Sequence, residues 1–348
     1  MITLSHIAKK AGVSVATASL ALRGRGQVAD GTAKRIRQIA RQLDYRPNPL
    51  LASLATRRFR SKGAVEGTPL AILEFSADFG SQHQKTIVQY SKDVAQFARN
   101  LGYSPTIYKL ANSSPTEPLS RELYHRMAQG IIIIGSMDMD RFGATMDWGH
   151  YPVVVCARFA HSLPFHTVRP NIFQAIKLAF DNLLGRGYRR IGFALGHHPI
   201  PIEDDESRHG AAIALANRFL PIKDRIPPFE GSYNDPKQFL AWFDRYRPDA
   251  VVAFSDGQYW VLKDAGYRIP EDVGLIGLHL AAARNPIKLA GLFQNRNEIA
   301  RQSVLHLDQL IRNREHGLPK LPLSILVPSH WIEGKTIRPA EPAAHGRS

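Results

Sequence analysis

The sequence predicts a small all-α domain followed by two α/β lobes, each built as a doubly wound parallel sheet. Two observations support this fold class. The first 46 residues place apolar side chains at helical spacing among many basic ones, and from Leu70 onward short apolar runs alternate with helical stretches, as in βαβ units. The length of 348 residues allows two or three domains. We expect four segments: a three-helix domain (1–46), a hinge helix and linker (47–63), a bilobal domain (64–337) and a mobile tail (338–348).

The composition is that of an ordinary globular protein. Apolar residues make up 44% of the chain and charged residues 22%, which argues against extensive disorder. The longest apolar stretch, 130–137, falls short of the roughly 20 residues that a membrane span requires. The first ten residues contain no apolar run of the kind that marks a secretory signal. We therefore expect a cytoplasmic protein without a membrane partner.

Positive charge is concentrated at the start of the chain. Residues 1–63 contain 13 Lys or Arg residues and two acidic ones, a formal net charge of +11, whereas the remainder of the chain carries +4. A basic module attached to a nearly neutral body indicates a polyanionic partner. Charge alone also allows a basic surface that serves only solubility.

The spacing of apolar residues in the basic segment predicts three helices, over 4–10, 15–22 and 31–43. Thr3 and Ser14 are good N-cap residues for the first two, and Gly12 supplies the turn between them. A helix, a tight glycine turn and a second helix form the arrangement that places the second helix in the major groove of DNA.

A fourth helical segment follows in the linker. Asn48 is a plausible N-cap and Pro49 suits the first helical position. The segment 49–57 is too short to be stable alone in water. Leu50, Leu51 and Leu54 lack obvious partners in so small a domain, and an apolar wedge in a minor groove is one use for such side chains. A plain interdomain linker is the alternative.

These segments together resemble the DNA-binding and hinge regions of the LacI/GalR family of bacterial transcription regulators. The resemblance is carried by Thr3-Leu4, Ile7-Ala8, Ala11-Gly12-Val13-Ser14, Thr17, Ser19, Tyr45, Pro47-Asn48 and Leu54-Ala55. It implies that two protomers each insert the second helix into a major groove. It also implies that paired hinge helices push Leu54 into the central base step of the minor groove.

The resemblance assigns roles to individual residues. Val15, Ala16 and Leu20 match the base-reading positions of the family, and Thr17 and Ser19 match backbone contacts. The DNA-binding residues expected on this basis are Thr3, Ser14, Val15, Ala16, Thr17, Ser19, Leu20, Arg23, Arg25, Lys34, Arg35, Asn48, Leu51, Leu54 and Ala55.

One departure from the family bears on specificity. Well-known members carry an arginine at the position of Leu20, so a bidentate contact from that position to guanine is absent here. Apolar contacts to thymine methyl groups and the deformability of the DNA would then carry more of the specificity. Arg23 or Arg25 could supply phosphate or guanine contacts.

The rest of the chain alternates between short apolar runs and helical stretches. The predicted strands are 70–75, 104–108, 130–134, 152–156, 191–195, 250–254, 273–277 and 323–327. The predicted helices are 85–101, 121–127, 171–184, 207–219, 237–245, 259–265 and 297–312.

This part resembles the periplasmic-binding-protein-like sensor domain of the same family. The segment 266–277 carries the resemblance best, helped by 187–193 and 326–334. Such lobes close on a small-molecule effector at the strand ends, and closure alters the paired hinges. Position matching places these residues at the effector: Ser76, Phe79, Arg158, Arg208, Ser255, Asp256 and His279.

The class of effector is left open by the residues present. Sugar-binding relatives place carboxylates where this chain has Ala157 and His279, and Pro170 replaces an aspartate. These departures argue against recognition of an ordinary neutral sugar, and Arg158, Arg208 and His279 favour an anionic or weakly hydroxylated effector, which includes a sugar-derived one. The alternative is that both arginines form salt bridges within the lobes.

No pattern in the sequence indicates an enzyme, a cofactor or a metal. Ser255-Asp256 lacks the glycine pattern of a hydrolase nucleophile. Cys156 is the only cysteine, which excludes a disulfide framework, and we expect it as a small apolar group in a strand. His197-His198, His209 and the acids at 203–206 lack metal-ligand spacing, and we expect a solvated loop there.

Three classes of function fit a basic domain joined to a bilobal one. The sequence favours a DNA-binding transcription regulator, a repressor acting as a homodimer on a double-stranded DNA operator. A ligand-binding protein of the periplasmic-receptor type would require an export signal. An architectural DNA-binding protein would not need a bilobal sensor.

Overall fold

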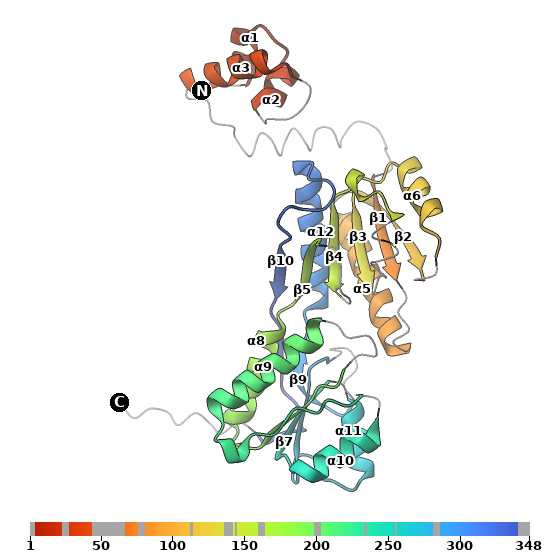
Figure 1. Ribbon diagram of the computed structural model, residues 1–348, viewed down its shortest axis with the longest axis vertical. Helices are drawn as coiled ribbons and strands as arrows, with labels where there is room; N and C mark the ends of the chain where they lie inside the picture. The colour runs from red at the N-terminus through yellow and green to blue at the C-terminus, as the bar shows by residue number, and fades with distance from the viewer. Residues whose placement is uncertain are drawn as a thin grey trace. The chain divides into compact units, whose positions relative to one another are not determined.

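The computed structural model divides the chain into two compact units, Met1–Val65 and Glu66–Ser348. The structure describes residues 4–22, 28–43, 67–75, 81–111, 114–135, 142, 145–158, 164–197, 203–232, 235–254, 256–280 and 286–339. Figure 1 shows both units as ribbons.

The first unit contains three helices in the described residues: α1 (Leu4–Ala11), α2 (Val15–Leu22) and α3 (Asp30–Gln42). They confirm the predicted three-helix pattern. Their shared core is formed mainly by alanines and by Ile7 and Ile36, both fully buried. Because alanine side chains are small, three short helices pack closely around so small a core.

The second unit begins with a six-stranded parallel sheet in the order β10-β5-β4-β3-β1-β2. Its strands are β1 (Thr68–Phe75), β2 (Tyr103–Leu110), β3 (Ile131–Gly135), β4 (Val153–Arg158), β5 (His166–Pro170) and β10 (Ser324–Val327). The associated helices are α5 (Ser81–Asn100), α6 (Thr116–His125), the short η1 (Trp148–His150) and α12 (Arg296–Asn313). We call this sheet and its helices lobe 1.

Lobe 2 is built on a five-stranded sheet in the order β11-β9-β8-β7-β6, parallel except for β11. Its strands are β6 (Ile191–Ala194), β7 (Ala250–Ala253), β8 (Gly274–Gly277), β9 (Ala290–Phe293) and β11 (His330–Ile332). Its helices are α8 (Ile172–Gly185), α9 (Glu203–Phe219), η2 (Ile222–Asp224), α10 (Pro236–Tyr246) and α11 (Gly257–Asp264).

Both faces of each sheet are covered, because successive side chains of a strand point to opposite faces. In β4, Val154 and Cys156 pack with α5 and α12, whereas Val153 and Val155 pack with α6 and the segment around Trp148. In lobe 2 one face packs on α8 and α9 and the other on α10 and α11. Figure 1 shows these layers in both lobes. The predicted doubly wound fold is therefore confirmed.

Several elements differ from the sequence prediction. The short strands β5, β9 and β11 were not predicted, because runs of three to five residues carry little periodicity. The prediction of a solvated loop at 203–206 is wrong: these residues form the first turn of α9, and Asp204 and Asp205 are buried. His209, also assigned to that loop, is a buried residue of α9.

Other single predictions have clear outcomes. Cys156 is buried in β4, as expected, and burial raises the pKa of its thiol to about 12. Arg338, placed at the start of the mobile tail, donates its backbone N–H to the Tyr188 hydroxyl at 2.9 Å. Residues 340–348 lie outside the described part of the chain. None of the described helices has both the length and the apolar character needed to cross a membrane.

Candidate functional site

The second helix of the basic unit is fixed at its start by a side-chain cap. The Ser14 Oγ accepts the Thr17 backbone N–H at 3.1 Å and lies 2.8 Å from the Thr17 hydroxyl. Gly12, with φ of +64°, makes the left-handed turn that lets α2 follow α1 directly. Ala18 and Ala21 face the core, and Val15 is 47% exposed. An apolar side chain is thus presented to solvent at the first turn of α2.

Two arginines of α3 hold the carboxyl ends of the other two helices. Arg35 donates from Nη2 to the Ala11 carbonyl at 3.0 Å, and Arg37 donates from Nε to the Ala21 carbonyl at 3.2 Å. Cations stabilise the negative end of a helix dipole. Arg35 is a predicted DNA-binding residue. Because its Nη2 already donates to the Ala11 carbonyl, a contact to DNA would use its other N–H donors. The role of Arg37 was missed, because sequence spacing does not show which carbonyl a long side chain reaches.

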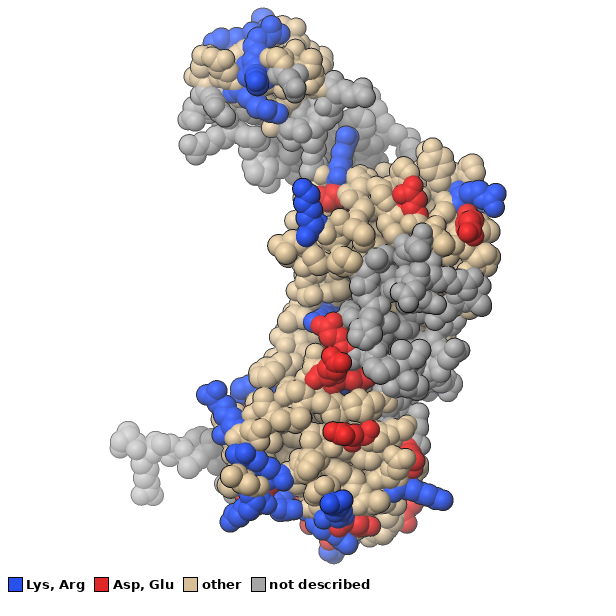
Figure 2. All heavy atoms as spheres, in the orientation of Figure 1, with Lys and Arg blue, Asp and Glu red and all other residues tan. Residues whose placement is uncertain are grey.

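The surface of the described three-helix unit is positively charged. Its described cations Lys9, Lys10, Lys34, Arg35 and Arg37 are all exposed. Figure 2 shows Lys and Arg side chains over the face turned to the viewer, with no acidic side chain among the residues described there. Such a surface suits a polyanion.

Many of the predicted DNA-binding residues fall where the structure gives no side chain. Ala16, Ser19 and Leu20 lie on α2, but their side chains are outside the described set. The remaining predicted residues outside the described part of the chain are Thr3, Arg23, Arg25, Asn48, Leu51, Leu54 and Ala55.

In lobe 2, chemistry-bearing side chains gather at the carboxyl ends of three neighbouring parallel strands. His197 follows β6, Phe254 follows β7 and His279 follows β8. The Arg208 guanidinium of α9 lies 5.0 Å from the Phe254 ring centroid, and the His279 ring lies 4.4 Å from the same ring. We call His197, Arg208, His209, Phe254 and His279 the strand-end site. Ligands of doubly wound sheets bind at such strand ends.

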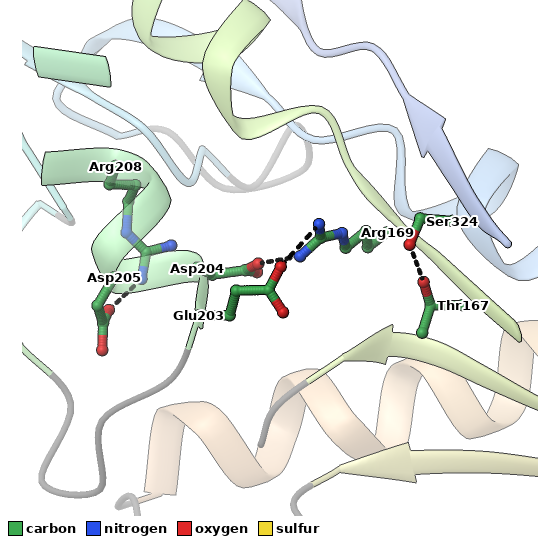
Figure 3. Close-up of polar contacts among 7 residues, drawn as sticks. All are labelled: Thr167, Arg169, Glu203, Asp204, Asp205, Arg208 and Ser324. Carbon is green, nitrogen blue, oxygen red and sulfur yellow. Dashed lines mark hydrogen bonds and ion pairs between the residues drawn. The ribbon is translucent and has the colours of Figure 1, made fainter. Parts of the chain in front are cut away.

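Arg208 is already paired within its own helix. It is 3% exposed, and its Nη2 donates to the Asp205 carboxylate one turn earlier (Figure 3). Its Nε is buried without a hydrogen-bond partner in the structure. The charge of Arg208 is thus balanced, but a buried N–H donor is left that a ligand or a water could use.

His209 offers the complementary group. Its Nδ1 lies 2.9 Å from the Asp205 carbonyl, which can only accept, so Nδ1 carries the proton. In the neutral ring Nε2 is then an acceptor, and it is buried without a partner in the structure. The His197 ring stacks on the His209 ring at 4.4 Å with an interplanar angle of 4°. No spacing rule indicates this stack, because only His209 belongs to α9 and His197 lies outside that helix.

The structure brings together two of the predicted effector residues, Arg208 and His279, which both contact the Phe254 ring. Asp256 is exposed immediately before α11. Ser76, Phe79 and Ser255 lie outside the described residues, as does the side chain of Arg158 in β4. No group of three or more metal-ligating side chains was found among the described residues.

Two family models match separate parts of the sequence. Residues 3–48 match the bacterial regulatory proteins of the lacI family, and residues 180–337 match a periplasmic binding protein-like domain. The first match covers the three-helix unit. The second covers most of lobe 2 together with α12 and β10 of lobe 1.

Individual relatives and solved structures agree with these matches. Catabolite control protein A of Staphylococcus epidermidis is 25% identical over 291 residues, which cover 80% of this chain and 82% of the relative. The same protein of Priestia megaterium is 25% identical over 293 residues, covering 79% and 82%. Two solved structures share the fold with TM-scores of 0.59 and 19% identity. The complex of the regulator CelR with cellobiose covers 97% of this chain and 100% of its own. The lac repressor dimer bound to operator and the anti-inducer ONPF covers 96% and 98%.

Proposed function

This chain belongs to the LacI family of bacterial regulatory proteins, and on that premise we propose that it is a transcriptional repressor that binds a pseudo-palindromic operator as a homodimer. The observation that carries the proposal is the capped α2 on an exposed basic surface, with Val15 turned to solvent. One such unit makes few contacts, and two units related by a twofold axis double them.

Within the first unit, we assign phosphate contacts to charged side chains and base contacts to an apolar one. Lys34 and Arg35 contact phosphates and fix the position of the unit, and Val15 contacts base edges. Removing a phosphate contact weakens binding to every sequence equally, whereas changing a base contact alters which sequence is preferred.

Full-length protein tests this proposal with duplexes selected from a random pool and read by fluorescence anisotropy. The Lys34→Ala variant should weaken binding to selected and scrambled duplexes alike, whereas Val15→Asn should weaken binding to the selected duplex and change the preferred bases. Arg268→Ala is the control, because Arg268 pairs with Asp272 in lobe 2. Full-length protein that does not prefer the selected duplex to the scrambled one would refute the proposal.

We place the effector at the strand-end site. The buried Arg208 Nε–H and the buried His209 Nε2 provide one donor and one acceptor, and the Phe254 ring provides an apolar group beside the tilted His279 ring. This combination favours a ring with hydroxyl groups, since a hydroxyl can both accept and donate. Because Asp205 already balances Arg208, an uncharged, sugar-derived effector fits better than an anionic one.

A thermal-shift screen of full-length protein tests the class of effector. Neutral sugars, sugar acids and sugar phosphates are compared at equal concentration, since the stabilisation by a ligand of the folded state grows with the ratio of its concentration to its Kd. Neutral sugars should raise the unfolding temperature, and Arg208→Gln should abolish the shift. A shift produced only by the acids and phosphates would instead support an anionic effector.

A further inference from the structure

The chain passes between the two lobes three times, and the three crossings are joined by hydrogen bonds. The crossings lie at 170–172, 293–296 and 327–330. The Asn171 N–H donates to the Val327 carbonyl at 2.8 Å, and the Gln174 side chain bonds both the N–H and the carbonyl of Ser329, at 3.0 and 3.1 Å. Asn295 Nδ2 donates to the Pro328 carbonyl at 2.6 Å. The three crossings therefore form one hinge about which the lobes can move.

Beyond this hinge an ion-pair cluster connects the lobes directly. Arg169 stands near the carboxyl end of β5 in lobe 1, and its Nη2 lies 3.1 Å from Glu203 Oε1 and its Nη1 3.3 Å from Asp204 Oδ1. Both acids belong to the first turn of α9 in lobe 2. Figure 3 shows Arg169 reaching across to both acids, and Figure 2 shows acidic side chains gathered over the start of α9.

The partial burial of this cluster strengthens the attraction between its charges. The side chains of Arg169 and Asp204 are 17% and 11% exposed, so solvent screens their attraction less than it screens a surface pair. Moving the lobes apart would break both contacts of Arg169 with these acids. Breaking these ion pairs therefore adds to the free energy needed to move the lobes apart.

The same helical turn also carries the strand-end site. Asp204 is followed directly by Asp205, which holds Arg208 by its side chain and His209 by its carbonyl. A displacement of the first turn of α9 therefore moves Arg208 and His209 as well. The ion pairs and the proposed effector site share one rigid element.

We propose that Arg169, Glu203 and Asp204 form an ionic latch that holds lobe 1 against lobe 2 and thereby sets how readily the strand-end site responds to its effector. The effector part of this statement rests on the function proposed above; the latch itself does not. Each contact that favours the closed arrangement raises the population that binds effector, so loss of the latch lowers effector affinity. One largely buried pair, Arg169 with Asp204, and one pair whose acid Glu203 is 45% exposed should together change that population about 3- to 10-fold.

The latch is tested in the full-length protein without effector and without DNA, by the distance between two spin labels. Lys109→Cys in β2 and Lys263→Cys in α11 are exposed attachment points in lobes 1 and 2, and the buried Cys156 should not react. Labelled protein is diluted with excess unlabelled protein, so that distances within one chain dominate. The electron–electron double resonance distribution then reports the separation of the lobes.

The Arg169→Gln variant should shift the distribution and broaden it. The triple variant Arg169→Glu, Glu203→Arg, Asp204→Arg should restore the original distribution. High salt should shift the protein that retains Arg169 and leave Arg169→Gln unchanged. Arg312→Gln is the matched control, because Arg312 pairs at 2.7 Å with Asp308 within α12 of lobe 1, at the end of that helix away from the hinge, and should have no effect.

Equal distributions for Arg169→Gln and the parent protein, at low and high salt, would overturn the latch. If Arg169→Gln does not fold, the double variant Glu203→Gln, Asp204→Asn makes the same test from the other lobe. Duplex binding is measured separately on every variant. If the distances change as expected but the protein does not prefer the selected duplex, only the proposed function is refuted and the latch stands.

Discussion

Ser14 is a single side chain on which the start of α2 depends. Its Oγ accepts the Thr17 N–H, which otherwise has no helical carbonyl to bind. Since N-cap removal costs about 1 kcal/mol, we expect Ser14→Ala to destabilise the first unit by about that amount. Hydrogen exchange of the α2 amides in the full-length protein measures the loss.

The matched replacement for this prediction is Ser14→Asn, because asparagine caps helices as well as serine does. It should retain slow exchange in α2. Fast exchange in both variants would mean that the hydroxyl acts through another contact, such as the one to the Thr17 hydroxyl.

Gly135 ends β3 at a point where the backbone leaves no room for a side chain. Its φ is +96°, and an added Cβ would lie 2.2 Å from the Phe75 carbonyl oxygen. We expect Gly135→Ala to lower the free energy of unfolding by about 1–3 kcal/mol, because both the clash and the backbone strain oppose it. Gly185, at the end of α8, has no atom within 4 Å of an added Cβ. Urea unfolding should therefore show a loss for Gly135→Ala and none for Gly185→Ala.

At the scale of the element, a pair of buried histidines lies beside the edge strand β10 of lobe 1. His166 Nδ1 accepts the Leu323 N–H at 3.1 Å, next to β10, and the His306 ring of α12 meets the His166 ring edge to face at 4.9 Å. Burial lowers the pKa of both rings, and His166 lowers that of His306 further. Glu315 acts in the opposite direction on both.

This pair predicts a dependence of stability on pH. Both rings have an ordinary pKa near 6.5 when unfolded and a lower one when folded, so the folded state favours the neutral form. The stability that the two neutral rings contribute is fully present above about pH 7. It is lost as the pH falls through the pKa values that the rings have in the folded protein. The urea midpoint should therefore fall between about pH 7 and pH 5, and His306→Phe should reduce that fall. The exposed His125→Gln serves as the control. A fall of the same size in His306→Phe would remove the pair as its cause.

The hinge segment 49–57 is a second element with a specific prediction. This segment lies outside the described residues, and its resemblance to a family hinge helix predicts that Leu54 enters the minor groove when DNA is bound. Leu54→Ala should weaken binding to the selected duplex by about 10-fold and binding to scrambled duplex much less, since an apolar wedge acts at a deformable base step. Equal losses on both duplexes, measured by anisotropy, would exclude the wedge.

At the scale of the whole molecule, the uneven charge distribution predicts a steep response to salt. Residues 1–63 carry +11 of the net +15. If a dimer neutralises about 6–10 phosphates, affinity for duplex should fall by about a thousand-fold or more between 50 and 200 mM salt. Anisotropy titrations at several salt concentrations measure the slope. A nearly flat response would contradict binding dominated by phosphate contacts.

The sequence alone determined the properties that depend on neighbours along the chain. Helix spacing, the Ser14 cap and the Gly12 turn predicted the three-helix unit, and alternating apolar runs predicted the two doubly wound lobes. These features are local, because hydrogen bonds of helices and the two faces of a strand are set by residues a few positions apart.

Only the tertiary structure decided which charged and aromatic groups meet. Arg169 lies more than 30 residues from Glu203 and Asp204, and His166 about 140 from His306, so no spacing rule connects them. Arg208 illustrates the difference: the sequence left open whether it binds a ligand or forms a salt bridge within the lobe, and the folded helix pairs it with Asp205. The partner of a long charged side chain depends on which groups lie near it in space and on the free-energy cost of leaving a buried charge unpaired. Both depend on how the fold packs.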